Sequence, residues 1–121
     1  CVAAAATVVG TLTLDRERAA RAASGLLLAT DVADYLVARG MAFRRAHEVV
    51  GALVRRLVAE RRDFADLSMD EWRGVSPLFA EDVRDAVTAR ASVSSRRTPQ
   101  STHPEAVAKS LSALRAWLKS A

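Results

Sequence analysis

Cysteine is almost missing from this sequence, because its only cysteine is residue 1. No disulfide can therefore form within the chain, and nothing indicates an oxidising compartment. Long hydrophobic runs are missing too: the longest, at the N-terminus, has about 14 residues, whereas a membrane-spanning helix needs about 20. A secretory signal would need a basic start and a cleavage motif, and neither is present. We therefore predict a cytoplasmic protein with no membrane partner.

Motifs that bind cofactors or metals are also absent from the sequence. It has no glycine-rich phosphate loop, no Cys/His cluster and no carboxylate and histidine group at metal-ligand spacing. The serines within residues 92–101 are not part of the G-x-S-x-G pattern that exposes a nucleophilic serine. We therefore predict no cofactor, no metal site and no catalytic residue in this chain.

Lysine is scarce, with two lysines against sixteen arginines, and the net charge is +4 with a pI of about 10.2. The arginines are scattered and alternate with acids, as in Asp15-Arg16-Glu17-Arg18. This alternation is typical of solvated helix faces rather than of a phosphate-binding stripe. The charge pattern therefore predicts no nucleic-acid partner.

The apolar residues recur at helical spacing, and no alternating β-branched run is present, so we predict an all-α protein. At 121 residues the chain can form one domain around one core. We assign residues 1–12 to the C-terminal turns of a helix, residues 13–28 to a connecting helix capped by Asp15, and residues 29–121 to a small multi-helix domain. The apolar helix begins abruptly at Cys1, which suggests that the chain was cut from a longer protein.

A helical corner is predicted within residues 29–47. Thr30 is a suitable N-cap, and Asp31 follows in the first turn, where the helix dipole favours a negative charge. Gly40 ends this helix at the C′ position, and a second helix starts near Phe43 and runs to about residue 61. Its predicted buried face comprises Phe43, Ala46, His47, Val50, Val54, Leu57 and Val58.

Further start signals follow along the chain. Ser68 and Glu71 form a capping box, and Ser76-Pro77 predicts a helix that continues to about Val87. Residues 88–101 are rich in Ser, Thr and Arg and predict one short helical turn and a loop. A second capping box, Thr102 to Glu105, predicts a last helix. The apolar residues of that helix repeat at heptad-like spacing: Val107, Leu111, Leu114 and Leu118.

Two histidines are the remaining candidates for chemistry. His47 lies on the predicted apolar face of its helix, and Glu48 beside it points about 100 degrees away, so the two form no ready dyad. We interpret His47 as a packed histidine in the core or at an interface. His103 is predicted to be exposed in the first turn of the last helix.

Two alternatives come from other functional classes. The helices around Gly40 could form a helix-turn-helix that presents Arg44 and Arg45 to DNA, although the second helix is long for that motif. The chain could also be a free-standing helical interaction module. Gel-filtration mass would test the module, and a salt-dependent DNA shift lost on replacing both arginines would test the DNA reader.

Four segments resemble one known family. ATDVADYLVARGMAFRRAHEVVG (residues 29–51) resembles the entry of argininosuccinate lyases into their small C-terminal helical domain. LSMDEWRGVSPLFAEDV (67–83), ASVSSR (91–96) and THPEAV (102–107) are similar to later motifs of the same family, in the same order. TLTLDRERAARAAS (11–24) is similar to the strip that links the core bundle to that domain.

The resemblance implies a place in the fumarase and aspartase superfamily, which includes the δ-crystallins. Members of the argininosuccinate lyase family are cofactor-free all-α homotetramers with a long central helix bundle. They cleave argininosuccinate to arginine and fumarate, and their catalytic serine lies in a G-S-S-x-M-P-x-K-x-N loop. The resemblance implies that residues 1–12 are the end of a central bundle helix. This chain has no such loop, so no catalytic residue carries over, and we expect it to be inactive alone. Its implied partners are the rest of the lyase chain and the other subunits. The corner residues Thr30, Asp31, Gly40, Phe43 and His47 are expected to have a structural role.

Overall fold

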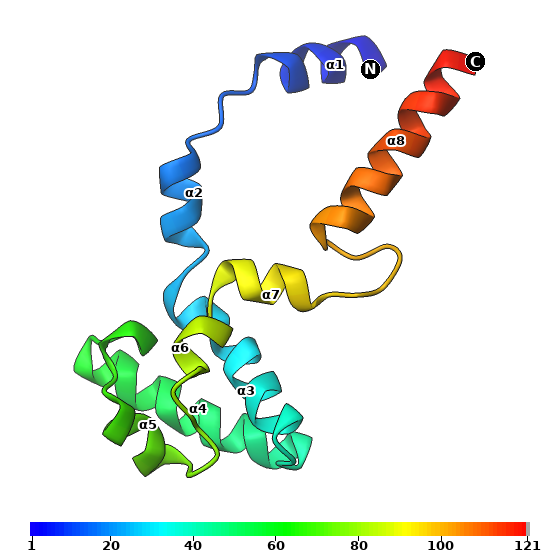
Figure 1. Cartoon of the computed structure of the whole chain (residues 1–121). Helices are drawn as coiled ribbons and strands as arrows, with labels where there is room; N and C mark the ends of the chain where they lie inside the picture. The colour runs from blue at the N-terminus through cyan, green and yellow to red at the C-terminus, as the bar shows by residue number, and fades with distance from the viewer. Residues whose placement is uncertain (121) are drawn as a thin grey trace.

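The computed structural model describes residues 1–120, and every regular element within them is a helix, as predicted. In chain order these are α1 (Val2–Thr11), α2 (Arg16–Ala22), η1 (Gly25–Leu28), α3 (Ala29–Ala38), α4 (Phe43–Glu60), η2 (Phe64–Asp66), α5 (Met69–Val75), α6 (Val83–Ala86), α7 (Ala89–Ser95) and α8 (Pro104–Ser120), where η marks a 3-10 helix (Figure 1). No helix in residues 1–120 is both long enough and apolar enough to cross a bilayer.

The hydrophobic core lies between α3, α4 and the segments that follow α4. α3 packs chiefly against α4 and contributes Val32 and Leu36, which are fully buried. Trp72 of α5 lies at the centre of an aromatic cluster, with its ring centroid 5.7 Å from that of Phe64 and 4.7 Å from that of Phe79. The stable part of the fold is therefore assembled from residues far apart in the sequence.

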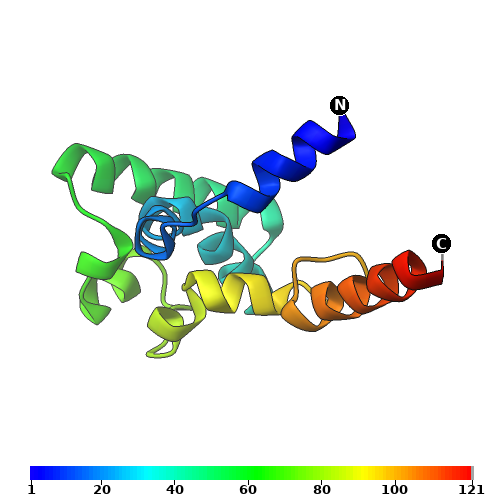
Figure 2. The same cartoon turned by 90° about the horizontal axis from the view of Figure 1, so that it is seen from above.

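The two ends of the chain lie outside this core. None of the residues of α1, α2 or α8 is buried, and Figures 1 and 2 show α1 and α8 extending away from the body of the molecule. Asp15 caps α2 as predicted, because its side chain accepts a hydrogen bond from the Arg18 amide. The division at residues 12 and 28 stays a prediction.

The start of α3 differs from the prediction for Thr30. The helix begins at Ala29, its N-cap is Leu28, and no side chain caps it. The 3-10 turn η1 runs directly into α3, so the backbone is already helical before Thr30, which becomes an exposed residue of the first turn. The capping role assigned to Thr30 is therefore wrong, whereas Asp31 does lie in the first turn.

The end of α3 confirms the role of Gly40. Gly40 has φ +95°, its N–H donates to the Val37 carbonyl at 2.9 Å, and the Met41 N–H donates to the Leu36 carbonyl at 3.0 Å. These two bonds form a Schellman motif, which needs a left-handed residue that glycine supplies without strain. Arg61 closes α4 in the same way with φ +54°, at the steric cost of a side chain.

The predicted buried face of α4 is rotated relative to the observed one. Leu53 is buried together with Ala46, Val50 and Leu57, but Phe43 is 64% and Val58 60% exposed. His47 is exposed as well, so it is not a core residue of this chain. The apolar arc of α4 is wider than the part that α3 covers, and periodicity alone could not show which edge stays uncovered.

Three later predictions need correction. The helix predicted from Ser76-Pro77 to Val87 is mostly turns, because only Val83–Ala86 is helical and Phe79 enters the core. Residues 89–95 form the seven-residue helix α7, capped by Thr88, instead of one turn. At the start of α8 the Glu105 N–H donates to His103 Nδ1 at 3.2 Å, and no hydrogen bond to Thr102 is present among the described residues. The capping box at Ser68 and Glu71 is confirmed.

Candidate functional site

The most highly connected polar cluster of the corner joins α3 to the turn before α6. Tyr35 of α3 and Arg39, the C-cap of that helix, lie one turn apart. The Arg39 guanidinium carbon is 3.7 Å from the centroid of the Tyr35 ring, a cation–π contact. Arg39 Nη2 also donates to both carboxylate oxygens of Asp82, at 2.8 and 2.7 Å. We call Tyr35, Arg39 and Asp82 the corner clamp.

The Tyr35 hydroxyl completes the clamp from inside. It donates to Asp82 Oδ1 at 2.7 Å and accepts from the Ala80 N–H at 3.2 Å. Tyr35 is 7% exposed, and its ring stacks on Phe79, with 5.6 Å between the centroids. One side chain thus holds the backbone, the carboxylate and the buried aromatic ring of residues 79–82 against α3.

The electrostatics of the clamp favour a fixed protonation state. Burial and the hydrogen bond to Asp82 raise the pKa of Tyr35 above its usual value. The hydrogen bonds from Tyr35 and Arg39 hold the pKa of Asp82 below its usual range. A general acid or base works best with a pKa near the operating pH, and both groups are moved away from neutrality. The clamp is therefore suited to holding the fold rather than to transferring protons.

A second polar cluster ties the end of α4 to the start of α5. Arg62 donates to both carboxylate oxygens of Glu71, at 2.7 and 3.0 Å, and to the Asp66 carbonyl at 2.8 Å. Glu71 also accepts from the Ser68 N–H at 2.9 Å in the capping box. The hydrogen bonds from Arg62 and from the Ser68 amide lower the pKa of Glu71 to about 2. This bidentate pair fixes the direction in which the chain leaves α4.

A third tie connects the start of α3 with the end of α7. Arg96 lies 3.6 Å from Asp31 Oδ1 and 4.0 Å from Asp34 Oδ2. The Asp31 side chain is 13% exposed, so its charge is largely shielded from water and depends on this partner. Arg96 thereby anchors the segment that leads to α8.

The five corner residues predicted from sequence do not form one site. Thr30 and Asp31 lie at the beginning of α3, and Gly40 lies beyond its other end, separated by a helix roughly 15 Å long. Phe43 and His47 form an exposed aromatic pair on α4, with ring centroids 4.4 Å apart. The structural role that we predicted for the five residues together stays a prediction.

Sequence reasoning missed the residues that make the tertiary ties, above all Arg39, Asp82 and Arg96. One local signal pointed to the clamp: Tyr35 and Arg39 have the i, i+4 spacing that places two side chains on one helix face. Asp82 lies 43 residues after Arg39, and no local pattern could identify it as the partner.

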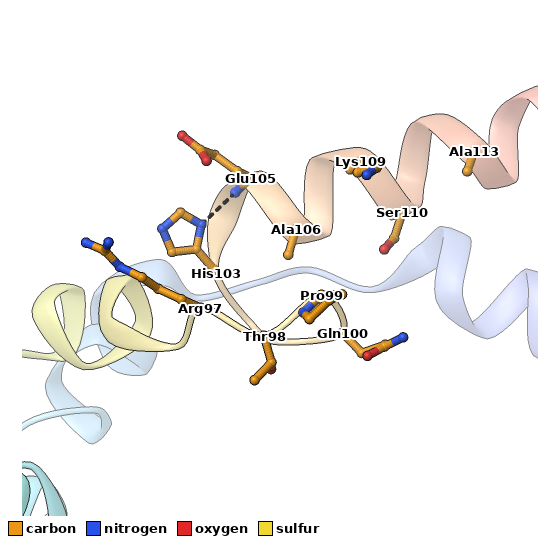
Figure 3. Close-up of a pocket in the computed structure, with 10 residues that line it drawn as sticks. All are labelled: Arg97, Thr98, Pro99, Gln100, His103, Glu105, Ala106, Lys109, Ser110 and Ala113. Atoms are coloured by element: carbon orange, nitrogen blue, oxygen red, sulfur yellow. Dashed lines mark hydrogen bonds between the residues drawn. The ribbon is translucent and has the colours of Figure 1, made fainter.

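The hollows in the described part of the chain include one of about 800 Å³ between residues 97–100 and α8, and Figure 3 shows His103 at its edge with Nδ1 accepting from the Glu105 amide. A second, of about 450 Å³, is bordered by Gly25, Trp72 and Arg84. A third, of about 310 Å³, lies between α4 and Val75. Within residues 1–120, no group of three or more His, Cys, Asp or Glu side chains could hold a metal ion.

Comparisons with known proteins agree on one family. A family model described as argininosuccinate lyase C-terminal matches residues 26–94. The argininosuccinate lyase of Geotalea daltonii is 46% identical over 95 residues, which cover 78% of this chain and 21% of the relative. That of Moorella thermoacetica is 48% identical over 92 residues, covering 76% and 20%. That of Mycolicibacterium smegmatis is 44% identical over 115 residues, covering 93% and 24%. The chain therefore spans between a fifth and a quarter of the length of these relatives.

Proposed function

The chain belongs to the argininosuccinate lyase family, and on this premise we propose that it acts as the C-terminal helical domain of an argininosuccinate lyase, in a structural role. In this role it closes one end of the enzyme's helix bundle and helps to order neighbouring active-site loops. The helix-turn-helix and free-standing module readings are not favoured, since the relatives named above are lyases.

The observation that carries the proposal is the position of the polar ties. The corner clamp and the Arg62–Glu71 pair both lie within residues 26–94, the range that matches the family model. Both ties join elements to each other, and the pKa values of Tyr35 and Asp82 are moved away from neutrality. These properties support a rigid accessory domain rather than a reaction centre.

The reaction that we propose for the whole enzyme is the β-elimination of argininosuccinate to arginine and fumarate. Removing a proton next to a carboxylate needs a positioned base and donors that stabilise the developing negative charge. We assign both to parts of the lyase outside residues 1–121, because the sequence has no G-S-S or M-P-x-K segment. We further propose that the enzyme is a cytoplasmic homotetramer. The exposed alanine-rich helix α1 supports a continuation into a bundle.

A domain exchange tests the structural role. The region of the Mycolicibacterium smegmatis lyase that aligns with this chain is replaced by this chain, and fumarate formation and sedimentation mass are measured. We expect a tetramer that forms fumarate, because the exchanged domain supplies packing and not chemistry. A matched control carries Tyr35→Phe in the exchanged domain, and we expect a lower melting temperature with an unchanged KM.

Two outcomes would contradict the proposal. If the isolated chain converts argininosuccinate to fumarate, it contains catalytic groups and the structural assignment is wrong. If a lyase that lacks the aligned region altogether remains a folded tetramer and forms fumarate at the parental rate, the domain has no structural role.

A further inference from the structure

The start of α8 is held by an imidazole instead of a hydroxyl or a carboxylate. The Val107 N–H donates to the His103 carbonyl at 3.0 Å, so His103 is the N-cap residue, and Pro104 is the first helical residue. The Glu105 N–H donates to His103 Nδ1 at 3.2 Å, as the dashed line in Figure 3 shows. This bond satisfies one of the amides that a helix start leaves without a backbone partner.

The bond requires one particular form of the ring. A neutral imidazole has one nitrogen that donates and one that accepts, so an accepting Nδ1 places the proton on Nε2. A protonated imidazole carries a hydrogen on both nitrogens and has no acceptor left. It would also bring a positive charge to the positive end of the helix dipole, where cations are unfavourable. Protonation of His103 therefore breaks the cap and leaves the Glu105 N–H facing a second donor.

The charged side chains around the ring do not reverse this preference. Arg97 of the preceding loop and Glu105 and Lys109 of α8 line the same hollow as His103 (Figure 3). The Glu105 carboxylate would attract a protonated ring, whereas Arg97 and Lys109 would repel it. Two cations and the helix dipole thus act against one carboxylate, so the surroundings favour the neutral ring that caps the helix.

The cap belongs to a series of hydrogen bonds that leads back to the core. The His103 N–H donates to Ser101 Oγ at 3.3 Å, and Ser101 Oγ donates to the Arg96 carbonyl. The Arg96 guanidinium in turn lies 3.6 Å from Asp31 Oδ1 on α3. No residue of α8 is buried. These local bonds, and not packing against the core, therefore position the start of α8 relative to the end of α7.

α8 is also sensitive to the loss of a single cap. It has 17 residues, which is close to the length at which a helix without buried residues is only marginally stable in water. The loss of one N-cap lowers the helix–coil equilibrium constant by a factor of about five. Serine, threonine, asparagine and aspartate caps keep their charge between about pH 8 and pH 5, whereas histidine changes its charge in that range.

We propose that His103 is a pH-sensitive N-cap, which fixes the start of α8 when the imidazole is neutral and releases it when the imidazole is protonated. The bond forms between atoms of this chain, so it does not depend on what the rest of a longer protein contributes. The proposal goes beyond the structural role proposed above. A failure of the domain exchange would leave it untouched.

The test compares the full chain at about pH 7.5 and about pH 5.5, a range in which histidine gains its proton. The α-carbon chemical shifts of Glu105, Ala106 and Val107 report the helix population of the first turn, and far-ultraviolet circular dichroism reports that of the whole chain. We expect the helix–coil equilibrium constant of the first turn to fall about fivefold at the lower pH. The near-ultraviolet signal of the aromatic core should stay constant, because α8 lies outside that core.

Three variants make the test specific. His103→Asn should have the same helix population at both pH values, because asparagine caps a helix without titrating. His103→Ala should have the lower population at both, because alanine supplies no acceptor. His47→Gln removes the other histidine of the chain and should respond to pH as the parent chain does.

Several results would overturn the proposal. A first turn that is equally helical at both pH values in the parent chain would show that protonation does not open the cap. A pH response that His103→Asn retains, or that His47→Gln loses, would assign the response to another group. Equal helix populations in His103→Ala and the parent chain at about pH 7.5 would show that the imidazole does not hold the helix start.

Discussion

Replacing Tyr35 with phenylalanine removes a single oxygen and thereby opens the corner clamp. That oxygen donates to Asp82 at 2.7 Å and accepts from the Ala80 N–H at 3.2 Å. A hydrogen bond to a charged group contributes about 1.5–3 kcal/mol, and an ordinary hydrogen bond such as that from the Ala80 N–H contributes about 1 kcal/mol. The Asp82 side chain is 59% exposed and can recover water, so the lower end of the first range applies. We expect Tyr35→Phe to lower the free energy of unfolding by about 2.5 kcal/mol.

Denaturant and thermal unfolding followed by far-ultraviolet circular dichroism measure this loss. For a domain of this size each kcal/mol lowers the melting temperature by roughly 4–8 °C, so we expect a decrease of about 10–20 °C. Thr7→Val is a matched control: it also removes a hydroxyl, but one that lies exposed on α1. Its effect should stay within about 0.5 kcal/mol.

A double-mutant cycle with Asp82→Asn separates the clamp from other effects of the substitution. Residues that share a hydrogen-bond network couple by about 0.5–3 kcal/mol, so the two losses should not add. A loss below about 0.5 kcal/mol for Tyr35→Phe, or simple additivity with Asp82→Asn, would refute the reasoning. Either result would mean that Phe79 and its neighbours are held by packing alone.

Three further predictions concern other elements. The hydrogen bonds from Arg62 and the Ser68 amide lower the folded pKa of Glu71 from 4.5 to about 2, so its stabilising effect is present above the unfolded pKa and is lost as pH falls through the folded one. The denaturant midpoint of Glu71→Gln should therefore lie below that of the parent chain at neutral pH, and this difference should shrink between about pH 4.5 and pH 2. A difference that stays constant with pH would contradict this. Arg61→Gly should raise the free energy of unfolding by about 1 kcal/mol, because Arg61 is exposed and its backbone is held at φ +54°, which glycine adopts without strain. An unchanged melting temperature would argue against strain at this position. Gly25→Ala should lower the free energy of unfolding by more than about 1 kcal/mol, because Gly25 has φ +73° and an added Cβ would collide with the Asp63 carboxylate. Calorimetry that shows no loss of stability would disprove this prediction.

Local signals were sufficient at three sites where a single turn of chain decides the outcome. The helix end at Gly40, the capping box at Ser68 and the N-cap at Asp15 were predicted correctly, because each depends on hydrogen bonds within four or five residues. The same locality explains the failure at Thr30. Its side chain is a good cap in isolation, but η1 already supplies a helical turn upstream.

Predictions from local sequence were wrong where segments far apart in the chain pack against the same residues. Ser76-Pro77 has the residues of a helix start, yet the backbone after it makes turns that bring Phe79 into the core and the Ala80 N–H to Tyr35. The prediction of which face of α4 is buried was wrong for a related reason: Phe43 and Val58 lie at the edge of an apolar arc that α3 covers only in part.

The all-α class, most helix ranges and the family resemblance followed from the sequence alone, because apolar periodicity, caps and motif order are properties of neighbouring residues. The corner clamp, the Arg96 link to Asp31 and the uncovered face of α8 could be seen only in the tertiary structure. Each depends on which residues approach from far along the chain, or on whether any approach at all. Packing of the whole core decides both, and no local pattern encodes them.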